Sequence, residues 1–271
     1  MIRAFAIAPV LLMLALSPAW ADARLTVLVD VLKLREAALI LREEGITYAE
    51  DLNTDMLAGD GGAGWQQQVE AIYDPARMVE MVRRALKIGV FGEDRGDVIA
   101  FFSSDLGVQI VDLENSARAA IQDPDIEAAA RERYAALAGG DDPRLAMIHE
   151  MVEGGDMINR NVTSAMNANY QFMRGLVTGG ALEMSDEDIL RDVASEIDEI
   201  TEDTTAWLYG YMLLAYSPLS DDELATYVAF AQTQAGQSLN AALFDGFGKA
   251  YEDISYALGR AVALNMTAQE L

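Results

Sequence analysis

The stretch SPLSDDELATYVAFAQTQAGQSLNAALF, residues 217–244, decides the fold class of this chain. Ser220 and Glu223 have the spacing of a capping box, in which each side chain accepts from the other residue's backbone amide, so a helix should begin at Asp221. Apolar residues then recur every three or four positions, and Gly236 marks a tight break before further helical spacing. The stretch therefore predicts a short amphipathic helix followed closely by a long one.

The same helical spacing recurs along the rest of the chain, whereas the alternating apolar and polar runs that are typical of strands do not. Glycine-rich breaks at 59–64 and 139–143 separate groups of helical segments. We therefore predict an all-α protein, a multi-helix bundle with no significant sheet. In detail, we expect a helix to end at Gly45, a new one to begin at Thr47, and one uninterrupted helix to cover residues 185–215.

A fainter copy of the motif lies 129 positions earlier in the chain. The matched pairs are Ile99 with Val228, Ala100 with Ala229, Phe101 with Phe230, Ser104 with Thr233, Gly107 with Gly236, and Ile110 with Leu239. They gather around the phenylalanine and the glycine of a helix break, which favours a degenerate internal duplication, with chance likeness of two amphipathic helices as the alternative. Each copy would be a helix hairpin that needs a neighbour to cover its apolar face, so the bundle should contain two related modules.

The second copy resembles bacterial exported proteins of the family that carries the domain of unknown function 2059. The resemblance covers about residues 205–260, with a weaker echo at about 75–130. It rests on the acidic start Asp221, Asp222, Glu223 and Leu224, followed by Phe230, Thr233, Gly236 and Leu239; the first copy keeps Phe101, Phe102, Ser104 and Gly107. The chain departs from the family at Ala231, where an aromatic residue is usual, and at Gln234 and Asp105, where proline is usual. The resemblance implies an all-helical periplasmic protein and brings no activity and no catalytic residues.

We expect no catalytic, cofactor-binding or metal-binding residues in this chain and no cofactor, and we assign a structural role to the shared motif. Its residues are Phe101, Ser104, Gly107, Glu223, Phe230, Thr233, Gly236 and Leu239.

The first 21 residues have the features of a secretory leader. Arg3 precedes an apolar run, and the small-residue ending Ala19-Trp20-Ala21 predicts cleavage before Asp22. The run is shorter than the about 20 residues that a bilayer span needs, which favours removal over anchoring. The chain has no cysteine, so disulfides and a lipid anchor on cysteine are excluded. We expect a soluble periplasmic protein with no membrane span after removal of the leader.

Composition divides the rest of the chain into four parts. These are N-terminal helices with a glycine-rich loop (22–64), a first helical module (65–138), Met- and Asn-rich connecting helices (139–184) and a second module (185–271). The formal charge of −25 repels nucleic acid phosphates and anionic lipids, which makes both poor partners. It would suit a basic protein partner, or serve only solubility.

The single histidine, His149, is the clearest candidate for acid–base chemistry. A zinc protease helix needs a second histidine where Glu153 stands, and a di-iron bundle needs a glutamate where Ala146 stands. A composite site with Glu150, Glu153 and Asp156 is one interpretation. A surface histidine on a short helix is the favoured one.

Two residue sets suggest metal binding but fit a structural role better. The carboxylates Asp192, Glu196, Glu199 and Asp203 follow helical spacing, and because one straight helix cannot wrap a hard cation, we interpret them as a solvated face. The methionines, whose thioethers can bind copper(I), are spread among apolar residues, which favours core filling. They are Met147, Met151, Met157, Met166 and Met173. Asn159, Asn161, Asn167 and Asn169, with Tyr170 and Gln171, give the same segment a polar side suited to a groove or a helix contact.

Three functions remain as hypotheses. The first is a non-enzymatic periplasmic protein that acts through protein–protein contacts, for example in envelope maintenance, because no catalytic residue set is recognisable. The second is a binder of a small apolar ligand or a metal ion in a groove between the modules, with the Met/Asn segment as its wall. The third is a hydrolase centred on His149, ranked last because no serine nucleophile motif accompanies the histidine.

Overall fold

A computed structural model describes residues 18–269, and it confirms the all-α prediction. This part of the chain forms thirteen helices and no strand. Their bounds are α1 Pro18–Val31, α2 Leu34–Met56, α3 Gly62–Ile72, α4 Pro75–Gly89, α5 Gly92–Phe102, α6 Asp105–Ala120, α7 Pro124–Leu137, α8 Pro143–Gly154, α9 Met157–Gly179, α10 Asp186–Ser195, α11 Ile197–Ala215, α12 Asp221–Ala231 and α13 Gln234–Gln269. The predicted leader lies outside the described residues except for its last four, which begin α1.

Helix starts follow the local chemistry of the sequence. The side chains of Asp74, Asp123 and Asp142 each accept a hydrogen bond from an amide in the first turn of α4, α7 and α8, at 2.9, 2.9 and 2.8 Å. Each aspartate precedes a proline, which suits the first helical position because no amide hydrogen is needed there. At α12 the capping box predicted for Ser220 and Glu223 is present with both of its hydrogen bonds.

Two predicted helix boundaries are wrong. Helix α2 continues through Gly45 and Thr47. Gly45 allows close packing and does not end a helix, because a Cβ there would lie 2.5 Å from Cζ of Tyr73. The chain bends earlier instead, at Lys33, whose backbone is left-handed with φ of 46°.

The helix predicted to be continuous from 185 to 215 is broken at Glu196. The Ser195 hydroxyl donates to the Asp192 carbonyl oxygen at 2.7 Å, and the Glu196 amide bonds to Val193 only three residues back. Such a tight turn and a serine bonded to its own helix bend or interrupt helical geometry.

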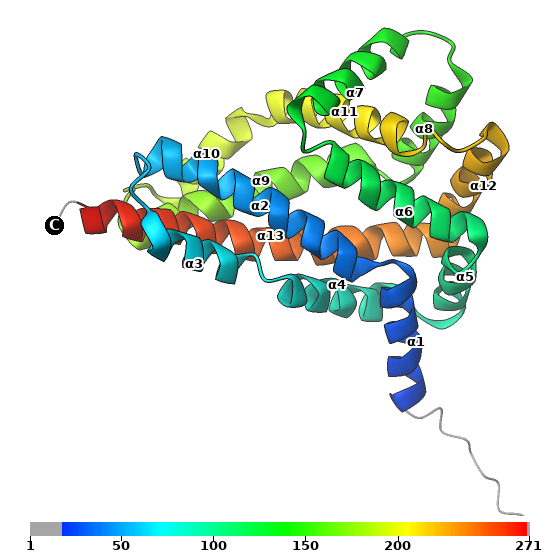
Figure 1. Ribbon diagram of the computed structural model, residues 1–271, viewed down its shortest axis with the longest axis horizontal. Coiled ribbons are helices and arrows are strands. Elements are labelled where there is room, and N and C mark those ends of the chain that lie inside the picture. Colours follow the sequence, from blue (N-terminus) through cyan, green and yellow to red (C-terminus); the bar gives the residue numbers. More distant parts are fainter. Residues whose placement is uncertain (1–17, 270–271) are drawn as a thin grey trace, which may run out of the picture.

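Helix α13 is the central helix of the bundle. It has 36 residues and lies with α9 and α4 packed along it and α2 beside it (Figure 1). Its start belongs to one apolar core and its later turns to another. The first core includes Leu28, Leu86, Ile110, Leu213, Leu224 and Leu239, and the second core includes Leu52, Trp65, Met78, Leu176, Leu258 and Val262.

Glycines let the backbones of α9 and α13 approach closely. A Cβ on Gly175 would lie 2.7 Å from the Arg260 amide nitrogen, and one on Gly259 would lie 3.0 Å from the Phe172 carbonyl carbon. Real Cβ atoms keep larger distances from backbone, so these two positions need glycine.

Among the described residues, no helix combines the length and the apolar character that crossing a bilayer requires.

Candidate functional site

The two helix breaks of the sequence motif have the same hydrogen bonds. At the first, the Ser104 hydroxyl donates to the Phe101 carbonyl at 2.6 Å and accepts from the Gly107 amide at 3.1 Å. At the second, the Thr233 hydroxyl donates to the Phe230 carbonyl at 2.7 Å and accepts from the Gly236 amide at 3.1 Å. The shared spacing therefore encodes one way of turning from a short helix into a longer one.

The glycines are needed because the turns are tight. A Cβ on Gly107 would lie 2.6 Å from the Phe102 Cα, and one on Gly236 would lie 2.8 Å from the Ala231 Cα. Both breaks thus depend on a hydroxyl residue, Ser104 or Thr233, and on the glycine three positions later. Whether they descend from a duplication stays a prediction.

We expect Ser104→Ala and Thr233→Ala each to destabilise the protein by about 1 kcal/mol, the usual cost of losing a helix N-cap. The measurement is the free energy of unfolding from urea denaturation. Ser103→Ala, a change at an exposed serine outside the cap, serves as the control. Equal effects at Ser103 and Ser104 would contradict the role of the cap.

The phenylalanines of the two breaks meet each other. The rings of Phe101 and Phe230 stack with centroids 3.9 Å apart and planes 9° apart, and Phe102 meets Phe230 edge-on at 5.6 Å. The remaining motif residues support this arrangement, since Glu223 caps α12 and Leu239 lies in the first core. The motif therefore joins the two helix hairpins.

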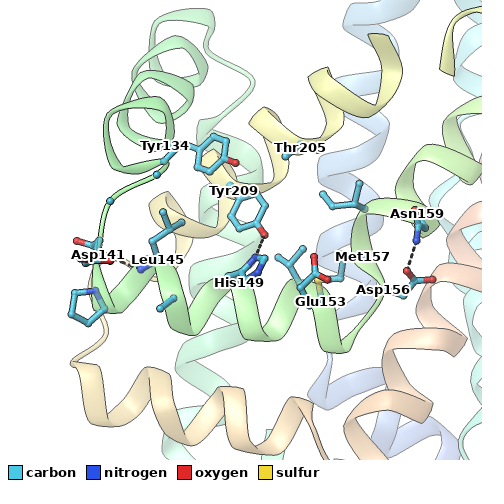
Figure 2. A pocket seen from close by; sticks show the side chains of 18 residues that line it. Tyr134, Asp141, Leu145, His149, Glu153, Asp156, Met157, Asn159, Thr205 and Tyr209 are labelled. Atoms are coloured by element: carbon cyan, nitrogen blue, oxygen red, sulfur yellow. Dashed lines mark hydrogen bonds between the residues drawn. The ribbon is translucent and has the colours of Figure 1, made fainter. Parts of the chain in front are cut away.

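His149 lies in an open cleft of about 870 Å³ between α7, α8, α9 and α11 (Figure 2). Its Nδ1 and the Tyr209 hydroxyl oxygen are hydrogen bonded at 2.6 Å, and the Tyr134 ring stacks on Tyr209 at 4.8 Å. Burial, with smaller contributions from Tyr134 and Glu153, raises the pKa of Tyr209 to about 12. The partner of His149 is thus a neutral phenol.

The structure brings part of the composite set around His149 together. Glu153 and Asp156 line the same cleft, and the Asp156 carboxylate accepts a hydrogen bond from the side-chain amide of Asn159 at 2.6 Å. Glu150 is not among the lining residues, and its carbonyl accepts from Gln232. Within residues 18–269 no group of three or more acidic or histidine side chains is placed to hold a metal ion.

The other sets proposed for metal binding do not converge. The carboxylates at 192, 196, 199 and 203 are all exposed, on either side of the break between α10 and α11. Met147, Met151 and Met157 pack in or against the first core, and Met173 packs against the second. These four methionines thus fill core space, whereas Met166 is partly buried and belongs to neither core. Met157 also lines the cleft of His149.

A second hollow contains chemistry that the sequence patterns did not reveal. This Glu114 cavity has a volume of about 310 Å³. Its walls come from the turn before α2 and from α2, α5, α6, α11, α12 and α13. The lining residues are Leu32, Leu34, Ala37, Leu41, Phe102, Val111, Glu114, Asn115, Arg118, Tyr211, Tyr227, Leu239, Leu243, Phe247 and Tyr251.

Three tyrosines outside α6 bind Glu114. The hydroxyls of Tyr216 and Tyr227 both donate to Oε1, at 2.8 and 2.9 Å, and the Tyr211 hydroxyl donates to the backbone carbonyl at 3.1 Å. No group in the described part of the chain donates to the other carboxylate oxygen, Oε2. One side of this carboxylate is therefore held, and the other is free.

The interior position changes the acidity of these groups. Burial raises the pKa of Glu114, and its hydrogen bonds to Tyr216 and Tyr227 oppose that shift. Burial, followed by the charge of Glu114, raises the pKa of both tyrosines well above the usual value. The tyrosines are thus neutral donors, and ionised Glu114 lacks the solvation it would have in water.

Two neighbours on α6 complete the polar side of the cavity. Arg118 forms a bidentate pair with Glu44, at 2.7 to 3.0 Å, and its guanidinium lies 4.9 Å from the centre of the Trp207 ring. The Asn115 side-chain nitrogen is buried and has no acceptor in the structure. Buried polar groups are nearly always paired, so such an atom points to a missing partner.

No family model, no curated protein and no solved structure matches this chain. Membership of the family that the sequence resembles therefore stays a prediction, and the function has to be argued from the site.

Proposed function

We propose that the protein binds a small molecule in the Glu114 cavity. The observation that carries this proposal is the carboxylate of Glu114, held by two tyrosine hydroxyls on one oxygen while its other oxygen has no donor within the described residues. Because Oε2 is not among the buried unpaired atoms, a ligand in the cavity can reach it, and carboxylates with a raised pKa concentrate at functional sites. The cavity volume is also at the lower end of the range typical of small-molecule sites.

The place of the cavity supports one part of the sequence-based hypothesis of a groove between modules. Its walls come from the N-terminal helices (22–64) and from both proposed modules, so it lies where these three parts meet. The Met/Asn segment of residues 139–184 contributes none of its lining residues, and the expectation that this segment forms the wall is not met here.

Filling the cavity should abolish binding. Ala37 lines it, so Ala37→Phe places a ring in the space that a ligand would occupy. The test is a thermal-shift and calorimetric screen of a small-molecule library, with native mass spectrometry of the purified protein. We expect bound compounds to lose at least about tenfold in affinity in this variant, as is usual when a binding pocket is blocked.

The matched control is Ala119→Phe, the same change at an exposed alanine on α6. It should leave affinity unchanged. If no compound binds the unmodified protein, or if Ala37→Phe binds every compound as the unmodified protein does, the proposal is wrong.

Protein contact through the cleft of His149 is the second candidate. Asp141, Asp142, Glu153 and Asp156 line that cleft beside the stacked tyrosines, and this charge complements a basic segment of a partner protein. A polypeptide retained in the native mass spectrum, instead of a small molecule, would favour this candidate. Both candidates assume export to the periplasm, which the predicted leader supports.

A further inference from the structure

We propose that the Glu114 cavity selects a small organic monocation, an amine or ammonium with an apolar body. This inference rests on the proposed function and adds the charge of the ligand to it. Three features of the cavity carry it: the free carboxylate oxygen, the neutralised arginine, and the aromatic and apolar walls.

The free oxygen of Glu114, Oε2, is a hydrogen-bond acceptor for which residues 18–269 provide no donor. Tyr211, Tyr216 and Tyr227 have already committed their hydroxyl hydrogens to Glu114. A ligand therefore meets an acceptor on Oε2, and none of these three tyrosines has a hydroxyl hydrogen left to donate to it. A cationic N–H group, or a positive charge placed beside this oxygen, satisfies it most strongly.

The only cation among the residues that line the cavity is Arg118, and its charge is already matched. Glu44 takes two of its nitrogens, and the guanidinium lies against the Trp207 ring. The pair Arg118–Glu44 is neutral as a unit, so Glu114 sets the charge of the cavity. An anionic ligand would face this carboxylate without a free cation to offset the repulsion.

The walls can accommodate both a cation and a hydrocarbon body. The rings of Phe102, Tyr211, Tyr227, Phe247 and Tyr251 line the cavity, and the electron-rich face of an aromatic ring attracts a cation. The leucines at 32, 34, 41, 239 and 243 provide apolar surface for the rest of the molecule. The large negative charge of the chain also raises the local concentration of cations.

A neutral ligand with a hydrogen-bond acceptor is the competing reading. If Glu114 were protonated, its Oε2 would become a donor, and a ligand carbonyl or hydroxyl would pair with it. The two readings differ in the ligand charge that they favour, so compounds of one shape and different charge separate them.

The experiment compares three compounds with the same ring: cyclohexylmethylamine, cyclohexylmethanol and cyclohexanecarboxylate. Calorimetric titration at pH 7 gives the affinity of the unmodified protein for each. We expect the amine to bind at least about tenfold tighter than the alcohol, in line with charge-assisted against neutral hydrogen bonds, and the carboxylate to bind weakest. Binding of the alcohol or the carboxylate as tightly as the amine would overturn the inference and leave the proposed function standing. Binding of none of the three, nor of any library compound, would overturn both.

Replacement of the carboxylate tests its role directly. Glu114→Gln keeps the shape and removes the charge, so the amine should lose at least about tenfold in affinity while the alcohol changes little. Glu132→Gln, at an exposed glutamate of α7, is the control and should change neither. Retained amine selectivity in a folded Glu114→Gln protein contradicts the inference. If this variant does not fold, the comparison of the three compounds on the unmodified protein still decides.

Discussion

Gly259→Ala is expected to destabilise the protein by about 3 kcal/mol, the upper end of the usual cost of overpacking. Alanine favours a helix over glycine by about 1 kcal/mol, so local propensity alone predicts the opposite sign. The collision decides, because the new methyl group would lie 3.0 Å from the Phe172 carbonyl carbon and overlap the carbonyl oxygen. The backbone at Phe172 cannot rotate away as a side chain can, so helix α9 has to shift away from α13.

The measurement is the free energy of unfolding from urea denaturation. Gly64→Ala is the matched control, since Gly64 lies within α3 and a Cβ there would have nothing within 4 Å. It should stabilise the protein by about 0.5–1 kcal/mol. If the two changes shift stability in the same direction, the close approach of α9 and α13 is not as described.

Phe230→Ala should cost about 3 kcal/mol, the lower end of the range for a phenylalanine in a core, because the ring is only partly buried. Beyond apolar surface, the change removes the stack with Phe101 that joins the two helix hairpins. A double-mutant cycle with Phe101→Ala isolates the stack. We expect a coupling of about 1 kcal/mol between the two rings.

Phe91→Ala is the control for this cycle. Its side chain is 67% exposed, and its loss should change stability by no more than about 0.5 kcal/mol. Strict additivity of Phe101→Ala and Phe230→Ala would show that the rings act independently, against the structure.

Local signals predicted most helix starts and failed where packing at a distance decides. Asp74, Asp142 and Ser220 cap their helices through neighbours two or three residues away, so the sequence contains both partners of each bond. The prediction that a helix ends at Gly45 fails because the residue that explains this glycine, Tyr73, lies 28 positions later. The break at Glu196 depends on a serine that most helices tolerate.

One feature of the sequence indicates the Glu114 cavity, whereas the partners of Glu114 cannot be predicted from it. An acid at 114 interrupts the apolar stripe formed by Ile110, Val111 and Ala117 on α6, and such an interruption marks a position worth inspecting. Its partners Tyr216 and Tyr227 are 102 and 113 positions away. No spacing rule connects residues so far apart, so the sequence alone does not predict this site.

The span of α13 has a consequence for how the chain matures. Leu239 near its start closes the first core, and Leu258 near its end closes the second. Each core lacks a wall until α13 is available, so neither half of the molecule can reach its final packing before this helix has been synthesised. Final packing of both cores thus waits for the same helix, which couples the folding of the two halves.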